Sequence, residues 1–123
     1  MGSIEISEEL KKRTIQFASS IVKFFQQLPK TTEAQIIGKQ LFRSSTSVAS
    51  NYRAACRAQS DSEFYSKLCI VVEEADETLF WLELLIETGI TKPENTNLYI
   101  KETTELLAIF ASARKTLKKK LDK

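Results

Sequence analysis

Apolar residues recur at steps of three and four residues along almost the whole chain, in four long stretches. This spacing places them on one face of an α-helix. The chain of 123 residues has only three Gly and two Pro, the residues that most disfavour helix interiors. Pro29 and Gly89 fall between the stretches, where helices are expected to end. The pattern predicts an all-α protein and argues against a turn-rich β fold.

Short segments with helix-capping residues separate the four stretches. Ser or Thr followed three residues later by Glu or Gln is typical of a helix start, and this pairing occurs at Thr32, Ser60 and Thr91. Short loops between long helices make successive helices antiparallel. The sequence predicts one domain, residues 1–123, folded as an antiparallel up-down-up-down four-helix bundle with helices at about 7–28, 32–58, 61–88 and 92–121.

The residue inventory argues against catalysis. The chain has no histidine, so it lacks the usual general base and the commonest nitrogen ligand for metals. A di-iron bundle site needs carboxylates from four helices, whereas those from Glu73 to Glu77 all fall within one predicted helix. No C-x-x-C motif and no glycine-rich phosphate loop is present in the sequence. We expect no catalytic residue, no metal, no cofactor and no enzymatic activity.

The cellular compartment is indicated by what the chain does not encode. It has no run of about 18 apolar residues, and residues 1–7 do not form a secretory signal. Cys56 and Cys69 lie inside helical patterns, where reduced packing thiols are expected. We expect a cytoplasmic protein with no membrane partner.

Several polar residues fall where the second and third helices face each other. These helices form a hairpin that turns near Ser60, and equal steps from the turn place Arg43 level with Glu77 and Ser47 level with Glu73. Arg and a carboxylate pair bidentately, which fixes the register of two helices. The set is interpreted as a structural polar lock, with a ligand site as the alternative; it comprises Arg43, Ser47, Asn51, Glu73 and Glu77.

The third helix carries a second apolar face, roughly opposite its core stripe. This face is interleaved with glutamates and contains Ile70, Phe80, Trp81 and Leu84. Contiguous apolar patches on a surface usually mark interfaces. We expect an oligomer interface here; the alternative is a wide buried face covered by loops or by the first helix. The sequence therefore predicts a bundle that assembles with copies of itself.

Basic residues gather at one end of the predicted bundle. The start of the first helix, the turn between the second and third helices and the end of the fourth helix meet there. Such a cluster attracts phosphate backbones without reading sequence; the alternative is a solvated tail that favours the helix dipole and solubility. The candidate nucleic-acid-binding residues are Arg53, Arg57, Arg114, Lys115, Lys118, Lys119 and Lys120.

Three motifs give the chain a family resemblance. They are R-S-S-T-S-V-A-S-N at 43–51, A-Q-S-D-S-E-F at 58–64 and E-A-D-E-T-L-F-W-L-E-L-L at 74–85. In these motifs the chain resembles the bacterial four-helix bundles related to the 23S ribosomal RNA intervening-sequence protein. The resemblance implies a homopentamer, so together with the apolar face of the third helix it leads us to expect a cyclic homo-oligomer. It also extends to the accessory variability determinant of diversity-generating retroelements, which pairs with a reverse transcriptase and binds nucleic acid.

These observations favour a non-enzymatic, self-assembling bundle that acts as an adaptor. Its expected partners are copies of itself, five in all as the resemblance implies, together with RNA, DNA or a nucleic-acid enzyme bound at the basic end. The alternative is a structural module that binds only proteins.

Overall fold

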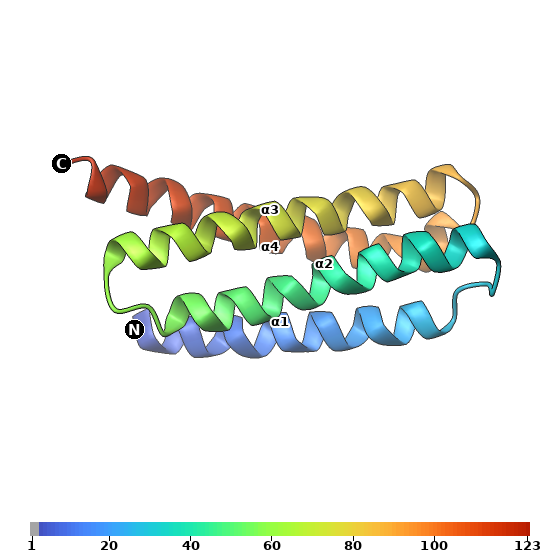
Figure 1. Cartoon of the computed structure of the whole chain (residues 1–123), viewed down its shortest axis with the longest axis horizontal. Coiled ribbons are helices and arrows are strands. Elements are labelled where there is room, and N and C mark those ends of the chain that lie inside the picture. The colour runs from blue at the N-terminus through green and yellow to red at the C-terminus, as the bar shows by residue number, and fades with distance from the viewer. Residues whose placement is uncertain (1–2) are drawn as a thin grey trace.

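Four long helices lie side by side and antiparallel in the computed structural model (Figure 1). The structure describes residues 3–123, with side chains from residue 7 onward. Over this range the chain is helical apart from three short connections, so the predicted all-α four-helix bundle is confirmed. The helices are α1 (Ser3–Gln26), α2 (Thr32–Cys56), α3 (Asp61–Glu87) and α4 (Pro93–Leu121).

Local sequence explains where the helices begin and end. The Thr31 hydroxyl caps α2 by accepting from the Ala34 N–H at 3.4 Å, one residue earlier than the expected Thr32 cap. The Ser60 hydroxyl caps α3 by accepting from the Glu63 N–H at 3.1 Å. Gly89 has φ +75°, the left-handed conformation that glycine adopts most readily after a helix.

Other boundaries differ from those expected. The first helix begins at Ser3 and ends at Gln26 and does not follow the predicted range 7–28. The fourth begins with Pro93 at its first position and has no side-chain cap, in place of the cap expected at Thr91. Proline suits this position because its φ is already helical and the missing N–H would have had no partner within the helix.

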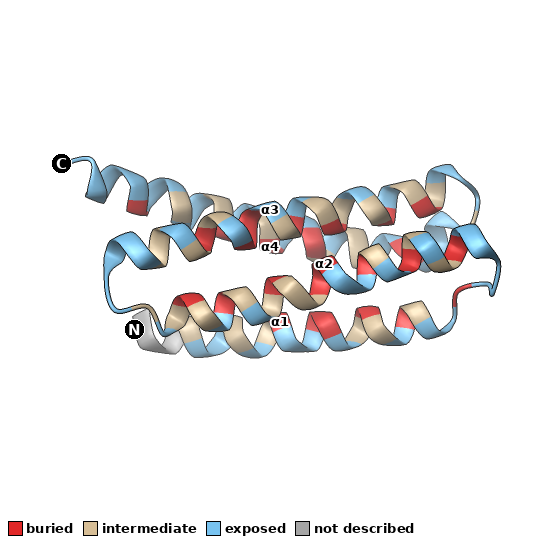
Figure 2. Ribbon diagram, in the orientation of Figure 1, coloured by how far each residue is buried: buried red, intermediate tan, exposed pale blue. Residues whose placement is uncertain are grey.

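The core is a continuous apolar cluster along the bundle axis (Figure 2). Helices consecutive in the chain pack against each other. Aromatic pairs join the remaining helices: the rings of Phe24 and Tyr99 connect α1 to α4 at 4.7 Å, and those of Tyr52 and Phe110 connect α2 to α4 at 5.0 Å. These contacts close the bundle on all sides.

The buried stripe of α3 is wider than its apolar periodicity predicts. The spacing of apolar residues predicts a core stripe made of Phe64, Leu68, Val71, Ala75, Leu79, Leu82 and Ile86. Val72, Thr78 and Leu85 are buried, whereas Leu79 and Ile86 are only half-buried. The reason is that α3 packs against both α2 and α4, which covers more of its circumference than a single neighbour covers. Thr78 is accommodated because its hydroxyl donates to the Ser44 hydroxyl of α2 at 2.9 Å.

Gly38 lets α2 approach α1 closely. A Cβ atom at this position would lie 2.6 Å from Leu28 Cδ1 and 2.8 Å from Phe25 Cδ1. Both distances are shorter than side-chain carbons tolerate, and Leu28 is itself buried. Glycine inside a helix costs about 0.5–1 kcal/mol relative to alanine, so packing rather than helix propensity explains its presence here.

Gly38→Val should lower the free energy of unfolding by about 2 kcal/mol, because overpacking a dense core costs more than the gain in backbone order. Urea denaturation followed by circular dichroism measures this loss. Ala108→Val, at an exposed site on α4, is the control and should change stability by less than about 0.5 kcal/mol. Equal effects at both sites would show that Gly38 is not needed for close packing.

Candidate functional site

The predicted basic residues lie at one end of the bundle, but on two separate surfaces. Arg53 and Arg57 of α2 line a groove of about 530 Å³ against α1. The α1 wall of this groove contributes two more basic residues, Lys11 and Lys12. We call this feature the α1–α2 groove; its lining residues are Glu8, Lys11, Lys12, Ile15, Gln16, Ala49, Arg53 and Arg57.

The second basic surface is the C-terminal part of α4, which we call the α4 tail. It contains Arg114, Lys115, Lys118, Lys119 and Lys120, all exposed except the half-buried Arg114. Lys120 Nζ lies 2.8 Å from Asp61 Oδ2, which ties the tail to the start of α3. Figure 1 shows this part of α4 reaching past the turn between α2 and α3. The tail is therefore an open, convex surface, in contrast to the groove.

Some basic side chains at this end are already paired with carboxylates. Arg13 donates from Nε and Nη2 to both carboxylate oxygens of Glu102, at 2.8 and 2.7 Å, and from Nη2 to Glu105 at 3.0 Å. Lys11 pairs with Glu8 at 2.5 Å within α1. Arg13 therefore holds α1 against α4, and it contributes little charge to a ligand.

The two arginines of the α1–α2 groove, unlike Arg13, are not engaged in ion pairs with the carboxylates that the structure describes. Arg53 and Arg57 are both exposed to solvent. Among the side chains that the structure describes, no carboxylate forms an ion pair with either of them. Their full positive charge is therefore available to a ligand in the groove.

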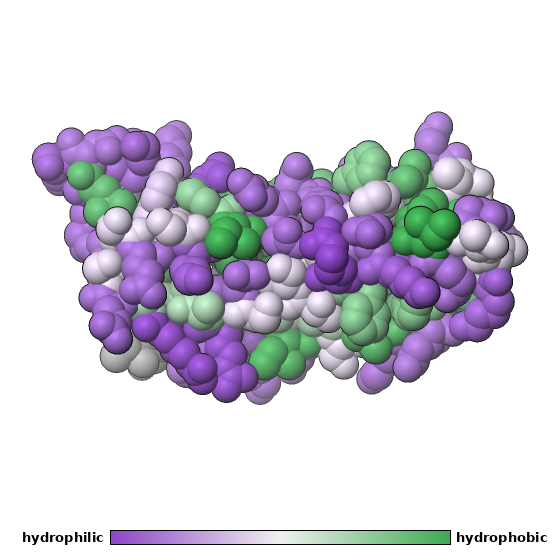
Figure 3. All heavy atoms as spheres, viewed as in Figure 1, coloured by the Kyte–Doolittle hydropathy of each residue, from purple (hydrophilic) through white to green (hydrophobic). Residues whose placement is uncertain are grey.

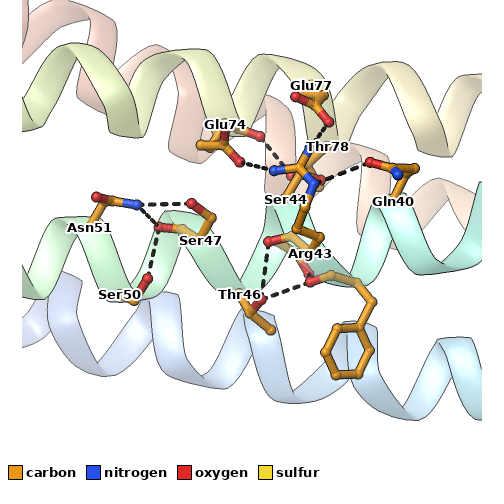
Figure 4. A network of polar contacts seen from close by, with 12 residues as sticks. Gln40, Arg43, Ser44, Thr46, Ser47, Ser50, Asn51, Glu74, Glu77 and Thr78 are labelled. Atoms are coloured by element: carbon orange, nitrogen blue, oxygen red, sulfur yellow. Dashed lines mark hydrogen bonds and ion pairs between the residues drawn. The ribbon is translucent and has the colours of Figure 1, made fainter.

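The polar network between α2 and α3 centres on Arg43 (Figure 4). Its guanidinium donates to Glu77 and, at 3.0 Å, to Glu74, while its Nε donates to the Gln40 side chain at 3.1 Å. Glu77 also accepts from the Trp81 indole N–H at 2.9 Å. One arginine thus binds two successive turns of α3 and fixes the register of the hairpin.

Two members of the predicted polar lock lie elsewhere. Ser47 does not meet Glu73; its hydroxyl accepts from Asn51 Nδ2 at 2.8 Å, one turn further along α2. Asn51 thus engages Ser47 within α2. Glu73, expected level with Ser47, is exposed, and its neighbour Glu74 joins the network by pairing with Arg43. The Arg43 side chain is also 48% exposed, so the lock is a surface network and not a buried ion pair.

Only part of the predicted interface on α3 is open to solvent. Phe80 is 52% exposed and Ile70 38% exposed. Trp81 and Leu84 are half-buried, and Trp81 packs edge-on to Phe80 with ring centroids 4.9 Å apart. Figure 3 shows hydrophobic side chains on the face formed by α2 and α3, interrupted by hydrophilic ones. The apolar surface is therefore smaller than the sequence indicated, and Phe80 is its most exposed member.

The sequence pattern did not identify the apolar lining of the groove. Ile15 lies opposite the core stripe of α1, between Lys11 and Lys12 on one side and Gln16 on the other, and it is 53% exposed. The sequence feature that could have indicated the groove is a single apolar residue, Ile15, on an otherwise polar face of the helix. Its meaning depends on Ala49 of α2 lying across from it, which only the packed structure shows.

Comparison with known proteins places the chain in a family. The family model described as 23S rRNA-intervening sequence protein matches residues 8–112. The chain belongs to this family. The match includes the α1–α2 groove and the Arg43 network and ends just before Arg114, so the α4 tail lies beyond the matched residues. The resemblance inferred from the three motifs is thereby confirmed.

A solved structure supports the same assignment. The chain is 36% identical, with a TM-score of 0.79, to a protein of unknown function from the S23 ribosomal protein family of Bacteroides thetaiotaomicron. The alignment covers 85% of this chain and 97% of that one. A search of curated proteins found no match. Within residues 3–123, no helix is long and apolar enough to cross a membrane. Among the side chains described, those from residue 7 onward, no cluster of three metal-ligating residues occurs.

The surroundings of Glu77 make the Arg43 network sensitive to pH. The Trp81 N–H, and secondarily Arg43, hold the pKa of Glu77 below its usual 4.5, while partial burial opposes them. Because the pKa is lower in the folded state, this interaction stabilises the fold above about pH 4.5. Its contribution is lost as the pH falls through the folded-state pKa.

Glu77→Gln should destabilise the fold at pH 7 by about 1 kcal/mol, the scale of a partly exposed ion-pair network. The difference from the unmodified protein should shrink as the pH falls below 4.5 and through the lowered folded-state pKa of Glu77, where the carboxyl becomes protonated in both states. Urea titrations at pH 7 and below pH 4.5 provide the measurement. The control is Glu73→Gln, one turn away and outside the network, for which little change is expected at either pH; a pH-independent loss at Glu77 would contradict the assignment.

Proposed function

We propose that this protein is a non-enzymatic adaptor that binds nucleic acid, or a nucleoprotein, through the basic end of the bundle. The observation that carries the proposal is the convergence of exposed Arg and Lys side chains from α1, α2 and α4 at that end. Basic clusters of this kind bind phosphates through charge and the release of counterions. Membership of a family named for an intervening sequence of 23S rRNA supports the proposal.

The distribution of carboxylates strengthens the electrostatic argument. Glu102 and Glu105 are engaged by Arg13, and Glu74 and Glu77 by Arg43. Arg13 and Arg43 thus offset part of this acidic charge, whereas no carboxylate whose side chain the structure describes forms an ion pair with Arg53 or Arg57. The field at that end is therefore positive even though the whole chain carries a formal charge of only +2.

Neutralising the α4 tail should weaken binding to all sequences about equally, because phosphate contacts position a ligand without specifying its sequence. The variant is Lys118→Gln with Lys119→Gln and Lys120→Gln. For a single strand, the slope of log affinity against log salt should fall by up to about 2, since each lysine that no longer neutralises a phosphate lowers it by about 0.7. Fluorescence anisotropy with labelled oligonucleotides across a salt series measures this slope. No binding of RNA or DNA at low salt would favour a module that binds only proteins.

We also propose that the chain assembles as a cyclic homo-oligomer through the exposed face of α3. Phe80 and Ile70 present apolar surface flanked by glutamates, a composition typical of an interface. A pentamer is the assembly that the family resemblance implies. The half-buried Trp81 supports Phe80 from behind, so Phe80 is the better position at which to test the interface without disturbing the fold.

Phe80→Gln should shift the assembly toward smaller species, because an exposed aromatic anchor commonly contributes about 2 kcal/mol to an interface. Light scattering after size-exclusion chromatography, at micromolar concentration, measures the change. The matched control is Leu98→Gln, which replaces a side chain that is 79% exposed near the start of α4 and should leave the mass unchanged. A stable monomer before any substitution would refute the assembly proposal.

A further inference from the structure

The α1–α2 groove differs from the α4 tail in shape and in composition. It is a concave feature of about 530 Å³, within the range of small-ligand sites. Its walls are basic, from Lys12 on α1 and from Arg53 and Arg57 on α2, and its apolar lining comes from Ile15 and Ala49. A surface that only attracts phosphates has no need of an exposed isoleucine inside a groove.

The basic and the apolar side chains of the groove follow one another along its length, with the basic ones nearer the end of the bundle. Because α1 and α2 run antiparallel, Arg57 and Lys11 lie toward the end of the bundle, and Gln16 and Ala49 lie toward its middle. From Ala49 to Arg57 the helix rises by roughly 12 Å, at 1.5 Å per residue. Figure 3 shows hydrophilic side chains over the outer part of α1 and α2 and hydrophobic ones nearer the middle.

We propose that the α1–α2 groove binds a short single-stranded segment of nucleic acid, about one to two nucleotides long by the rise of the helix along it. Arg53, Arg57 and Lys12 contact phosphates at the outer end. Ile15 and Ala49 contact an unpaired base or sugar toward the middle, where the Gln16 amide offers both a donor and an acceptor to a base edge. The inference rests on the proposed function and deepens it by naming the ligand class and the site.

A single strand suits this groove better than a duplex does. Bases in a duplex are stacked and paired, so a convex double helix presents phosphates but cannot place a base face against Ile15. An unpaired strand exposes both its phosphates and its base faces. Single-strand sites typically combine a positive groove with side chains against which bases stack, most often aromatic ones; in this groove the aliphatic Ile15 is the side chain available for that contact. The convex α4 tail, in contrast, contacts phosphates of either form.

The test compares binding of a labelled single-stranded oligonucleotide and of the duplex of the same sequence, by fluorescence anisotropy at low salt. The unmodified protein should prefer the single strand. Arg53→Gln with Arg57→Gln should abolish that preference and lower the single-strand salt slope by about 1.4, which corresponds to two phosphates at about 0.7 each. Ile15→Gln should reduce the preference roughly threefold, the scale of one partly buried aliphatic side chain.

Two controls separate this inference from the proposed function. The triple Lys→Gln variant of the α4 tail should weaken both ligands and keep the preference for the single strand. Leu98→Gln, an exposed apolar substitution on α4 outside the groove, should leave the preference unchanged. Equal affinity for the two ligands, or a preference that survives Arg53→Gln with Arg57→Gln, overturns the groove assignment alone. Failure to bind either ligand overturns the proposed function and the groove assignment together.

Discussion

The register between α2 and α3 is the constraint on which the other surfaces depend. Two interactions fix it at the same level of the hairpin: the buried Thr78 hydroxyl donates to Ser44, and outside it Arg43 binds Glu74 and Glu77. A hydrogen bond in the core and an ion pair at its edge both require the same alignment, so a slip of one residue would break the two together. This alignment turns Phe80 toward solvent.

The periodicity of apolar residues is sufficient to predict the four helices and their antiparallel order, because each helix has to bury one face. It does not predict the width of the buried face. Thr78 and Ser44 are polar residues inside the core, and each is accommodated because its hydroxyl finds a partner on a neighbouring turn or helix. The sequence also does not specify which of two adjacent threonines caps a helix. Thr31 and Thr32 have the same side chain, and the cap is Thr31 because its backbone is extended.

The candidate sites show the same limit. Counting residues from the turn correctly places Arg43 beside Glu77. This works because both helices of an antiparallel hairpin rise by the same distance per residue. The same count places Ser47 level with Glu73, but the two do not meet: Ser47 accepts from Asn51 within α2, and Glu73 is exposed to solvent. Counting residues along one hairpin cannot predict the α1–α2 groove. Its two walls lie on helices whose separation depends on small residues such as Gly38, and no pattern in either helix alone specifies that distance.

The internal ion pairs and the basic end are connected through the distribution of charge. Arg13 and Arg43 each bind two carboxylates, so these two arginines join neighbouring helices and are themselves fully engaged in ion pairs. The exposed Arg53 and Arg57 then present their charge to solvent at the groove. Their field acts over about 8–10 Å at physiological salt, a distance comparable to the length of the groove. A phosphate near the end of the bundle is therefore attracted toward the groove before it contacts any side chain.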